Sequence, residues 1–218
     1  MSFDRLAPHY AWMEWLLAGR KLQTSRTVFV KEARQARSVL LVGEGHGRFL
    51  TELCRANPEA AICCVDASAE MNRVARQRLQ RAGLSLRNLE FHSVPILEFK
   101  STRRFDLVVT QFFLDCFDES ELVEVIGKLA SALSEGGTWI VADFQIPEKG
   151  WRRQRARLVL TMAYAFFRIA TKLPARRLSP PQKHFSASGL QLKERAEFNF
   201  GLIYSELWCA SCARTFSG

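Results

Sequence analysis

The residues best placed for chemistry form a glycine-rich loop and a carboxylate that follows it. Gly43, Gly45 and Gly47 lie in a GxGxG loop after an apolar run, and Asp66 ends the next apolar run. Glycine lets the backbone approach a ligand closely and turn into a helix, whose N-terminus favours a negative group. A carboxylate at the end of the second strand can accept hydrogen bonds from both ribose hydroxyls of a nucleoside. The two segments predict a nucleoside site, and capping of the next helix by Asp66 is the alternative.

The loop differs from the usual dinucleotide fingerprint. That fingerprint has glycine or alanine at the sixth position of GxGxxG, and the sixth position here is Arg48. The sequence therefore does not favour NAD as the ligand.

Short apolar runs predict the strands that must position these residues. Uninterrupted apolarity is typical of parallel strands buried on both faces, and the intervening segments have helical character. The expected strands are 38–42, 61–65, 89–92, 105–109 and 138–142, and the expected helices are 49–56, 69–81 and 120–133. Gly136 and Gly137 are expected to form the turn into the fifth strand.

The C-terminal part has a different pattern. Segments 192–200 and 202–210, joined at Gly201, predict an antiparallel strand pair. With the five earlier strands, this predicts an α/β fold: a Rossmann-like, open, seven-stranded and mostly parallel sheet with an antiparallel last strand. N-terminal helices precede the sheet, and a helical insertion follows the fifth strand.

In order and spacing, the motifs resemble those of the class I S-adenosylmethionine-dependent methyltransferases. The matching pieces are the Gly43–Gly47 loop, Asp66-x-Ser68-x-x-Met71, Phe105–Val109 and Leu133–Gly137. The N-terminal segment 3–10 is loosely similar to the opening of the ubiquinone/menaquinone C-methyltransferase branch. The resemblance implies one methyltransferase domain over 1–218, with N-terminal helices (1–37), a cofactor-binding core (38–145), a basic helical cap (146–190) and a C-terminal strand pair (191–218).

The resemblance also implies the cofactor, S-adenosyl-L-methionine, and the residues that hold it. The loop would pack against the methionine part, Asp66 would bind the ribose, and Ala67 and Met71 would border the adenine. The implied cofactor-binding residues are Gly43, Glu44, Gly45, His46, Gly47, Asp66, Ala67, Ser68, Met71, Val94, Pro95, Thr110, Gln111 and Phe112.

Two positions depart from the family pattern. The family usually has an acid two residues before the first glycine, where this chain has Leu41, so Glu44 is expected to hold the cofactor's ammonium instead. The loop after the third strand, 92–96, lacks the acid that usually faces the adenine amine. Backbone carbonyls of that loop are expected to replace it.

Asp115 and Tyr10 are the catalytic candidates. Methyl transfer from a sulfonium is an in-line displacement, so alignment and exclusion of water can supply much of the catalysis, and a base is needed only if the acceptor loses a proton. Asp115 could instead cap the helix that starts near Asp118. An aromatic set could form an acceptor pocket or belong to the core: Phe112, Phe113, Phe117, Phe144, Tyr164, Phe166 and Phe167.

Positive charge is concentrated in one segment. The net charge of the chain is +9, and residues 151–195 contain eleven basic residues and one acid. Residues 151–172 are basic at the start and apolar later, which indicates a helix that covers the acceptor site, contacts an anionic membrane, or does both. A local positive field also suits nucleic acid.

Composition excludes several classes of protein. Of the 218 residues, 48% are hydrophobic and 24% are charged, which argues against a disordered or fibrous chain. The N-terminus lacks an apolar signal region, so we expect a cytoplasmic protein, with peripheral membrane contact as a further expectation. The six cysteines predict no disulfide framework, and the Cys209-x-x-Cys212 pair has no partner pair for a metal site, so no metal is expected.

These observations favour methyl transfer from S-adenosyl-L-methionine to a hydrophobic, aromatic or lipid-like small molecule. An RNA methyltransferase that uses the basic segment is an alternative. Nucleic acid is the less favoured partner, because Thr110-Gln-Phe-Phe is not the Asn/Asp-Pro-Pro-aromatic signature common in amine-methylating nucleic-acid enzymes. A non-catalytic protein that keeps the cofactor site is the second alternative. The sequence predicts no particular oligomeric state.

Overall fold

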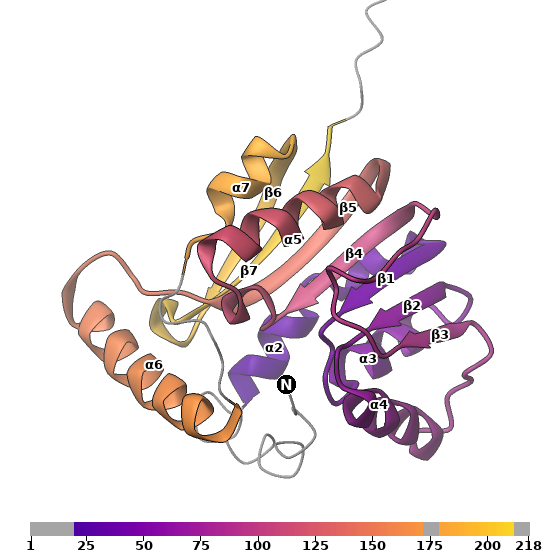
Figure 1. The fold of residues 1–218 in the computed structure, drawn as a ribbon, viewed down its shortest axis with the longest axis horizontal. Helices are drawn as coiled ribbons and strands as arrows, with labels where there is room; N and C mark the ends of the chain where they lie inside the picture. The colour runs from indigo at the N-terminus through magenta and orange to yellow at the C-terminus, as the bar shows by residue number, and fades with distance from the viewer. Residues whose placement is uncertain (1–19, 172–178, 212–218) are drawn as a thin grey trace, which may run out of the picture.

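A seven-stranded sheet forms the centre of the computed structural model, which describes residues 20–171 and 179–211 and, within 162–171, the backbone alone. The strand order is β3-β2-β1-β4-β5-β7-β6 (Figure 1). The strands are β1 (Ser38–Val42), β2 (Ala61–Val65), β3 (Leu89–His92), β4 (Phe105–Gln111), β5 (Leu133–Phe144), β6 (Leu190–Phe198) and β7 (Ile203–Ala210).

Pairing within the sheet follows the hydrophobic pattern of the sequence. β1 pairs in parallel with both β2 and β4, while β7 lies antiparallel to both β5 and β6. Side chains on both faces of β1 are buried, because Val39, Leu40 and Leu41 are each at most 1% exposed. The predicted Rossmann-like, mostly parallel sheet with an antiparallel last strand is confirmed.

Helices cover both faces of the sheet and produce three layers. α3 (Arg48–Ala56) and α4 (Ala69–Arg81) bury apolar side chains against one face, next to the shorter α2 (Arg20–Thr27) and η2 (Val30–Gln35). α5 (Glu119–Ala132) and α7 (Gln182–Ala187) pack on the opposite face. α6 (Gly150–Thr171) lies apart from these layers, beyond the end of β5 (Figure 1).

Capping residues define where two of the helices begin. Ser68 accepts a hydrogen bond from the Met71 backbone N–H and starts α4. Asp118 and Glu121 form a reciprocal capping box at the start of α5. Neither Asp66 nor Asp115 is therefore the N-cap residue of the helix that follows it, and both capping alternatives from the sequence are wrong.

The Gly136-Gly137 pair does not form a turn that precedes the fifth strand. β5 begins at Leu133, directly after α5, and runs through both glycines, with a shift of register against β4 between Phe105 and Leu107. A Cβ at Gly137 would lie 2.9 Å from the Ser134 carbonyl oxygen. Leu133 pairs with Phe105 and Thr138 pairs with Leu107, so extra residues of β5, the two glycines among them, lie between these pairs. Glycine tolerates the irregular backbone that such a shift of register requires.

Other expectations concern the N-terminal region and the membrane. Of the N-terminal helices expected in 1–37, the structure describes α2 and η2, and residues 1–19 lie outside the described part. Among the described residues, no helix is both long and apolar enough to cross a bilayer.

Candidate active site

The candidate site lies where the connections after β1 and β4 separate. These two strands are neighbours and run in parallel. β1 leads to α3 on one face, whereas β4 leads to α5 on the other. In open α/β sheets, ligands bind in the crevice at the carboxyl ends of the strands at such a reversal of strand order. The GxGxG loop follows β1 at this place, and Asp115 follows β4.

The three glycines adopt a backbone conformation that most residues avoid. Gly43, Gly45 and Gly47 have φ of 67°, 62° and 72°. A Cβ at Gly47 would lie 2.9 Å from Cα of Ala75, so this glycine lets α3 and α4 approach each other closely. A Cβ at Gly43 would overlap the ring of Phe113. The loop therefore packs tightly at both ends.

Gly45, at the centre of the loop, faces open space. A Cβ placed there would meet only the Met71 sulfur, at 4.0 Å. The backbone N–H of Gly45 donates to Oδ2 of Asp66 at 3.2 Å. The middle of the loop can therefore admit a ligand beside Asp66 and Met71.

Asp66 links the loops that follow β1 and β2. Besides its bond to Gly45, its Oδ1 accepts a hydrogen bond from the Ser68 backbone N–H at 2.9 Å. The side chain is partly exposed, and a carboxylate has lone pairs for more than two donors. Its role toward the ribose stays a prediction, with a carboxylate available in the expected place.

Glu44 contacts the helix that follows the loop. Its Oε1 accepts hydrogen bonds from the backbone N–H groups of Phe49 (2.7 Å) and Leu50 (3.1 Å) at the start of α3. A carboxylate there also interacts favourably with the helix dipole. These contacts give Glu44 a structural role that its sequence context did not predict, and binding of the cofactor's ammonium stays a prediction.

His46 is buried, and its carbonyl oxygen accepts a hydrogen bond from Arg78 Nε at 2.7 Å. This bond fixes the loop to α4.

The remaining residues predicted to bind the cofactor surround the start of α4 and the end of β3. Ser68 and Met71 are buried, whereas Ala67 is exposed. In the loop after β3, Val94 is half-buried and Pro95 is exposed. The structure thus brings these residues to the same edge of the sheet as Asp66, and their contacts with the adenine stay a prediction.

Two residues predicted to line the methyl-transfer site have buried side chains with partners inside the protein. The Thr110 hydroxyl accepts a hydrogen bond from Trp139 Nε1 at 2.9 Å. Gln111 donates from Nε2 to the Arg26 carbonyl oxygen at 2.8 Å, while its Oε1 is buried without a hydrogen-bond partner. Both side chains hold the end of β4 in place.

Phe112 is held in a strained conformation. Its φ of 54° lies in the left-handed region, which is rare for an aromatic residue, and such strain concentrates at functional sites. Its ring packs 4.9 Å from the ring of Phe144, with the Arg26 guanidinium 4.9 Å from its centroid. This strained residue immediately follows β4, at the reversal of strand order.

Asp115 lies beside a second carboxyl group that sequence reasoning missed. It is half-buried in the short helix η3 (Leu114–Cys116), and its backbone N–H donates to Oδ2 of Asp143 at 3.1 Å. Asp143 is 2% exposed and also accepts a hydrogen bond from the Phe144 N–H at 2.8 Å. The signal in the sequence was its position directly after the apolar run 138–142, as Asp66 follows 61–65.

The environment of Asp143 favours its neutral form. Burial raises the pKa of the Asp143 carboxyl well above its ordinary value, and the negative charge of Asp115 raises it further. Backbone N–H donors act in the opposite direction but do not outweigh these effects. The two carboxyls therefore differ: Asp143 is buried with a raised pKa, and Asp115 is the more accessible of the two.

An apolar cluster adjoins this edge of the sheet. Ala156 and Leu160 of α6 are buried in it together with Phe112, so the first half of α6 belongs to the same apolar cluster as the residue that follows β4. The full set of buried members is Leu22, Phe112, Ala142, Ala156, Leu160, Leu202 and Ile203. Tyr10 lies outside the described residues, as do the side chains of Tyr164, Phe166 and Phe167.

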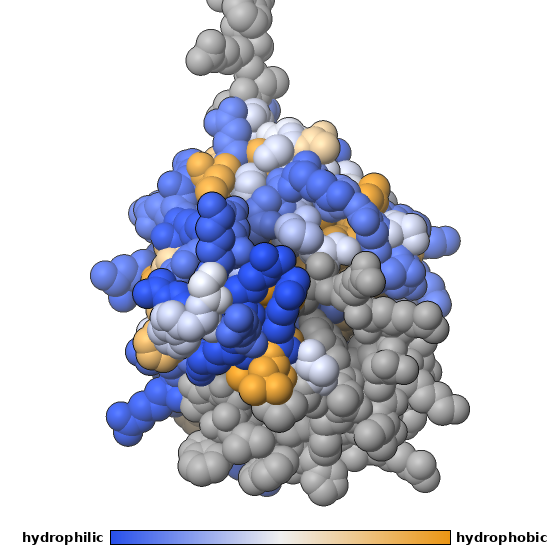
Figure 2. All heavy atoms as spheres, turned by 90° about the vertical axis from the view of Figure 1, so that its left-hand side faces the viewer, coloured by the Kyte–Doolittle hydropathy of each residue, from blue (hydrophilic) through white to orange (hydrophobic). Residues whose placement is uncertain are grey.

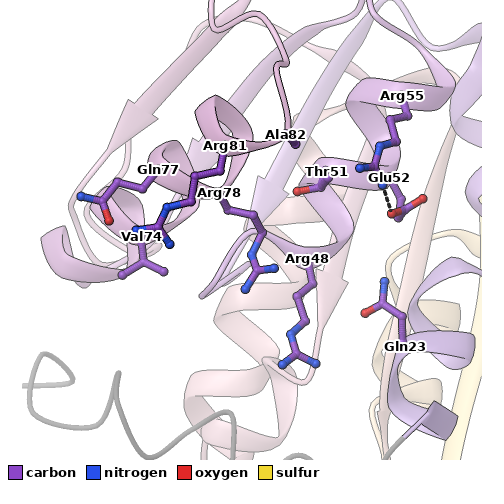
Figure 3. Close-up of a pocket in the computed structure, with 10 residues that line it drawn as sticks. All are labelled: Gln23, Arg48, Thr51, Glu52, Arg55, Val74, Gln77, Arg78, Arg81 and Ala82. Atoms are coloured by element: carbon purple, nitrogen blue, oxygen red, sulfur yellow. Dashed lines mark hydrogen bonds and ion pairs between the residues drawn. The ribbon is translucent and has the colours of Figure 1, made fainter.

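A separate cavity of about 630 Å³ lies between α3 and α4 (Figure 3). It is polar and basic, and it contains none of the residues predicted for the cofactor. Figure 3 shows the guanidinium groups of Arg48 and Arg78 directed toward the same space. The lining residues are Gln23, Arg48, Thr51, Glu52, Arg55, Val74, Gln77, Arg78, Arg81 and Ala82.

Within the described part of the chain, one group of side chains has the composition of a metal site. Cys63, Glu90 and His92 place potential ligand atoms within 4.8 Å of one another on β2 and β3. Glu90 already forms an ion pair with Arg103 at 2.5 Å, and burial raises the pKa of the Cys63 thiol to about 11. The carboxylate thus has a cation within the protein, and the thiol is neutral near pH 7.

Comparison with known proteins agrees with this geometry. Residues 39–137 match a family model described as a methyltransferase domain. A demethylmenaquinone methyltransferase from Thermus thermophilus is 29% identical over 150 residues, which make up 68% of this chain and 66% of that protein. The match therefore spans slightly less than two thirds of that relative.

Solved structures share the fold at low sequence identity. An O-methyltransferase family protein from Burkholderia thailandensis has a TM-score of 0.69 at 20% identity, covering 98% of this chain and 65% of that one. Magnesium protoporphyrin IX methyltransferase from Synechocystis PCC 6803, solved with bound SAH, has a TM-score of 0.69 at 16% identity, covering 95% and 97% of the two chains. The chain therefore contains a methyltransferase domain and has the fold of S-adenosylmethionine-dependent methyltransferases, which implies S-adenosyl-L-methionine as its cofactor.

Proposed function

We propose that this chain transfers a methyl group from S-adenosyl-L-methionine to a hydrophobic, aromatic or lipid-like small molecule. The observation that carries the proposal is the buried apolar cluster that contains Phe112, directly after β4, and two side chains of α6. Sites for small molecules are mostly apolar with a few well-placed polar groups, and Asp115, three residues after Phe112, is our candidate for such a group.

The residues present fit the cofactor. Gly45 leaves open space beside Met71, and Asp66 offers a carboxylate next to that space. Gly43–Gly47 and Asp66 would hold the cofactor, which supplies an electrophilic methyl group on its sulfonium. The α3 N-terminus already has the Glu44 carboxylate bound to it, which keeps the loop in a fixed shape.

Positioning by the end of β4 is the main contribution we assign to the protein. Thr110 and Gln111 are anchored by hydrogen bonds to Trp139 and Arg26, and Phe112 is fixed in a strained conformation. Rigid placement of reacting groups can supply a large part of the rate enhancement. An apolar cover also excludes water from the site.

Asp115 is the proposed proton acceptor for an acceptor that must lose a proton. Asp143 fixes its backbone through the 3.1 Å hydrogen bond, and burial raises the pKa of the Asp143 carboxyl. Of the two carboxyls Asp115 is the more exposed, so it is the one that an acceptor can reach. Asp143 is therefore a positioning residue.

Similarity to a demethylmenaquinone methyltransferase supports an aromatic acceptor with an apolar tail. The test is incubation with S-adenosylmethionine carrying a labelled methyl group, hydroxylated aromatic acceptors with and without apolar tails, and RNA. We expect the wild type to transfer label to the tailed aromatic compounds, and we expect Asp115→Asn to lose this activity. The matched control Asp118→Asn should keep it, because asparagine also caps helices well. Label in RNA alone would contradict the proposed acceptor class.

A further inference from the structure

We propose that the outer side of α6 and the neighbouring hairpin turn form a docking face for an anionic membrane surface. The face consists of Trp151 and Leu158 on α6, Phe200 in η4 (Asn199–Gly201), and the arginines Arg152, Arg153 and Arg157. It lies on the side of the molecule seen in Figure 2, where basic and apolar side chains lie side by side over α6.

Three large apolar side chains of this face are exposed. Trp151 is 57% exposed, Leu158 62% and Phe200 56%. Trp151 and Leu158 are seven residues apart, which places them on the same side of a helix. Ala156 and Leu160, on the opposite side, are buried in the apolar cluster that also contains Phe112. α6 therefore has one apolar side packed on the protein and a second one directed outward.

Phe200 belongs to the same surface although it comes from a distant part of the chain. Its ring lies 5.3 Å from the ring of Trp151, and the Arg155 guanidinium lies 5.3 Å from its centroid. Asn199 and Phe200 both have positive φ (51° and 60°), which asparagine tolerates but which is unfavourable for an aromatic residue. The turn thus keeps the Phe200 side chain exposed in a strained conformation, although the side chain gains nothing from burial inside the protein.

The charges around these side chains favour an anionic partner. Residues 150–161 of α6 contain four arginines and no acid, and Lys149 precedes them. The acids nearby are Glu148, before the helix, and Glu197, which hydrogen bonds to Gln145 and Arg195. Arg155 is bound to Asn199, Arg153 donates to the Glu148 carbonyl oxygen at 3.2 Å, and Arg152 lies close enough to Glu197 to lower the pKa of that carboxyl. The three arginines of the face are all exposed.

This combination fits a bilayer better than other anionic partners. Tryptophan and phenylalanine prefer the headgroup region, and arginine is attracted to anionic lipids. A nucleic acid would use the arginines but gives no reason for exposed leucine. Membrane contact would also bring the α6-covered edge close to lipid-soluble acceptors, a consequence that rests on the proposed function.

The experiment is co-sedimentation of the full chain with phosphatidylcholine vesicles that contain or lack phosphatidylglycerol, at low and physiological salt, without cofactor or acceptor. We expect binding that requires phosphatidylglycerol. Replacing Arg152, Arg153 and Arg157 by glutamine should weaken it roughly fivefold per arginine, and Trp151→Ser with Phe200→Ser should also release the protein.

Matched controls separate this face from general basicity. One control replaces three exposed arginines outside the face, Arg37, Arg81 and Arg87, by glutamine and so removes the same amount of charge. A second control, Val123→Ser, removes an exposed apolar side chain on α5. Failure of the wild type to bind anionic vesicles at low salt, an equal loss in the control variants, or retention on RNA but not on vesicles would each overturn the proposal. Methylation of a detergent-dispersed acceptor is measured separately. Vesicle binding without methylation would contradict the proposed function alone, and methylation without vesicle binding would contradict the docking face alone.

Discussion

Substitution of Asp66 tests whether its carboxylate binds the ribose or only holds two loops together. The structure shows two hydrogen bonds, from Gly45 at 3.2 Å and from Ser68 at 2.9 Å. Asp66→Asn keeps one amide oxygen, which can accept the bond from Ser68, but it places an amide N–H₂ opposite the Gly45 donor. We expect a loss of about 1 kcal/mol in the free energy of unfolding from this change.

The effect on ligand binding should be larger and should depend on the ribose. Hydrogen bonds to a charged group contribute about 1.5–3 kcal/mol, which corresponds to roughly 10- to 150-fold in affinity. The assay is titration calorimetry of the wild type and Asp66→Asn with S-adenosylhomocysteine and its 2′,3′-dideoxy analogue, analysed as a double-mutant cycle. A coupling energy of that size between Asp66 and the hydroxyls is expected. If the substitution lowers the affinity for both ligands equally, Asp66 does not bind the ribose and only joins the loops.

Three further predictions concern the loop and the carboxyl pair. Gly47→Ala should lower the free energy of unfolding by roughly 2–4 kcal/mol in urea denaturation, because the Cβ would lie 2.9 Å from Ala75 at a φ of 72°. If Glu44 binds the cofactor's ammonium in addition to the start of α3, Glu44→Gln should weaken the binding of S-adenosylhomocysteine more than the binding of an analogue without the amino group. Asp143 has a raised pKa when folded, so folding takes up a proton, and stability should fall as pH rises from about 4 toward the folded pKa. Asp143→Asn should remove that part of the slope in denaturation curves recorded across pH.

Each of these has a contrary outcome. An unchanged free energy of unfolding in Gly47→Ala would mean that α3 and α4 can move apart at no energetic cost. Equal losses of affinity for the two ligands in Glu44→Gln would mean that Glu44 contacts only α3. A pH dependence of stability unchanged by Asp143→Asn would show that this carboxyl is not held neutral.

The strands and the positions of the glycine loop could be predicted because their determinants are local. β1, β2 and β3 have the predicted bounds, and α4 begins and ends as expected, since buried strands and capped helices leave continuous patterns in the sequence. Asp66 stood out for the same reason, as a carboxylate directly after an apolar run.

Features that depend on tertiary contacts were not predictable in this way. The pairing of Leu133 with Phe105 places the glycine pair inside β5, and only the folded sheet shows it. The raised pKa of Asp143 depends on its burial and on the charge of Asp115, which lies 28 positions earlier in the chain. Contact between Phe200 and Trp151 likewise joins distant segments.

A crystal structure of the complex with S-adenosylhomocysteine would show where the cofactor binds. We predict the ribose hydroxyls against Asp66, the amino-acid part along Gly43–Gly47, and the sulfur directed to the apolar cluster that contains Phe112. Binding in the arginine-lined cavity between α3 and α4, or no binding at saturating ligand, would contradict this prediction.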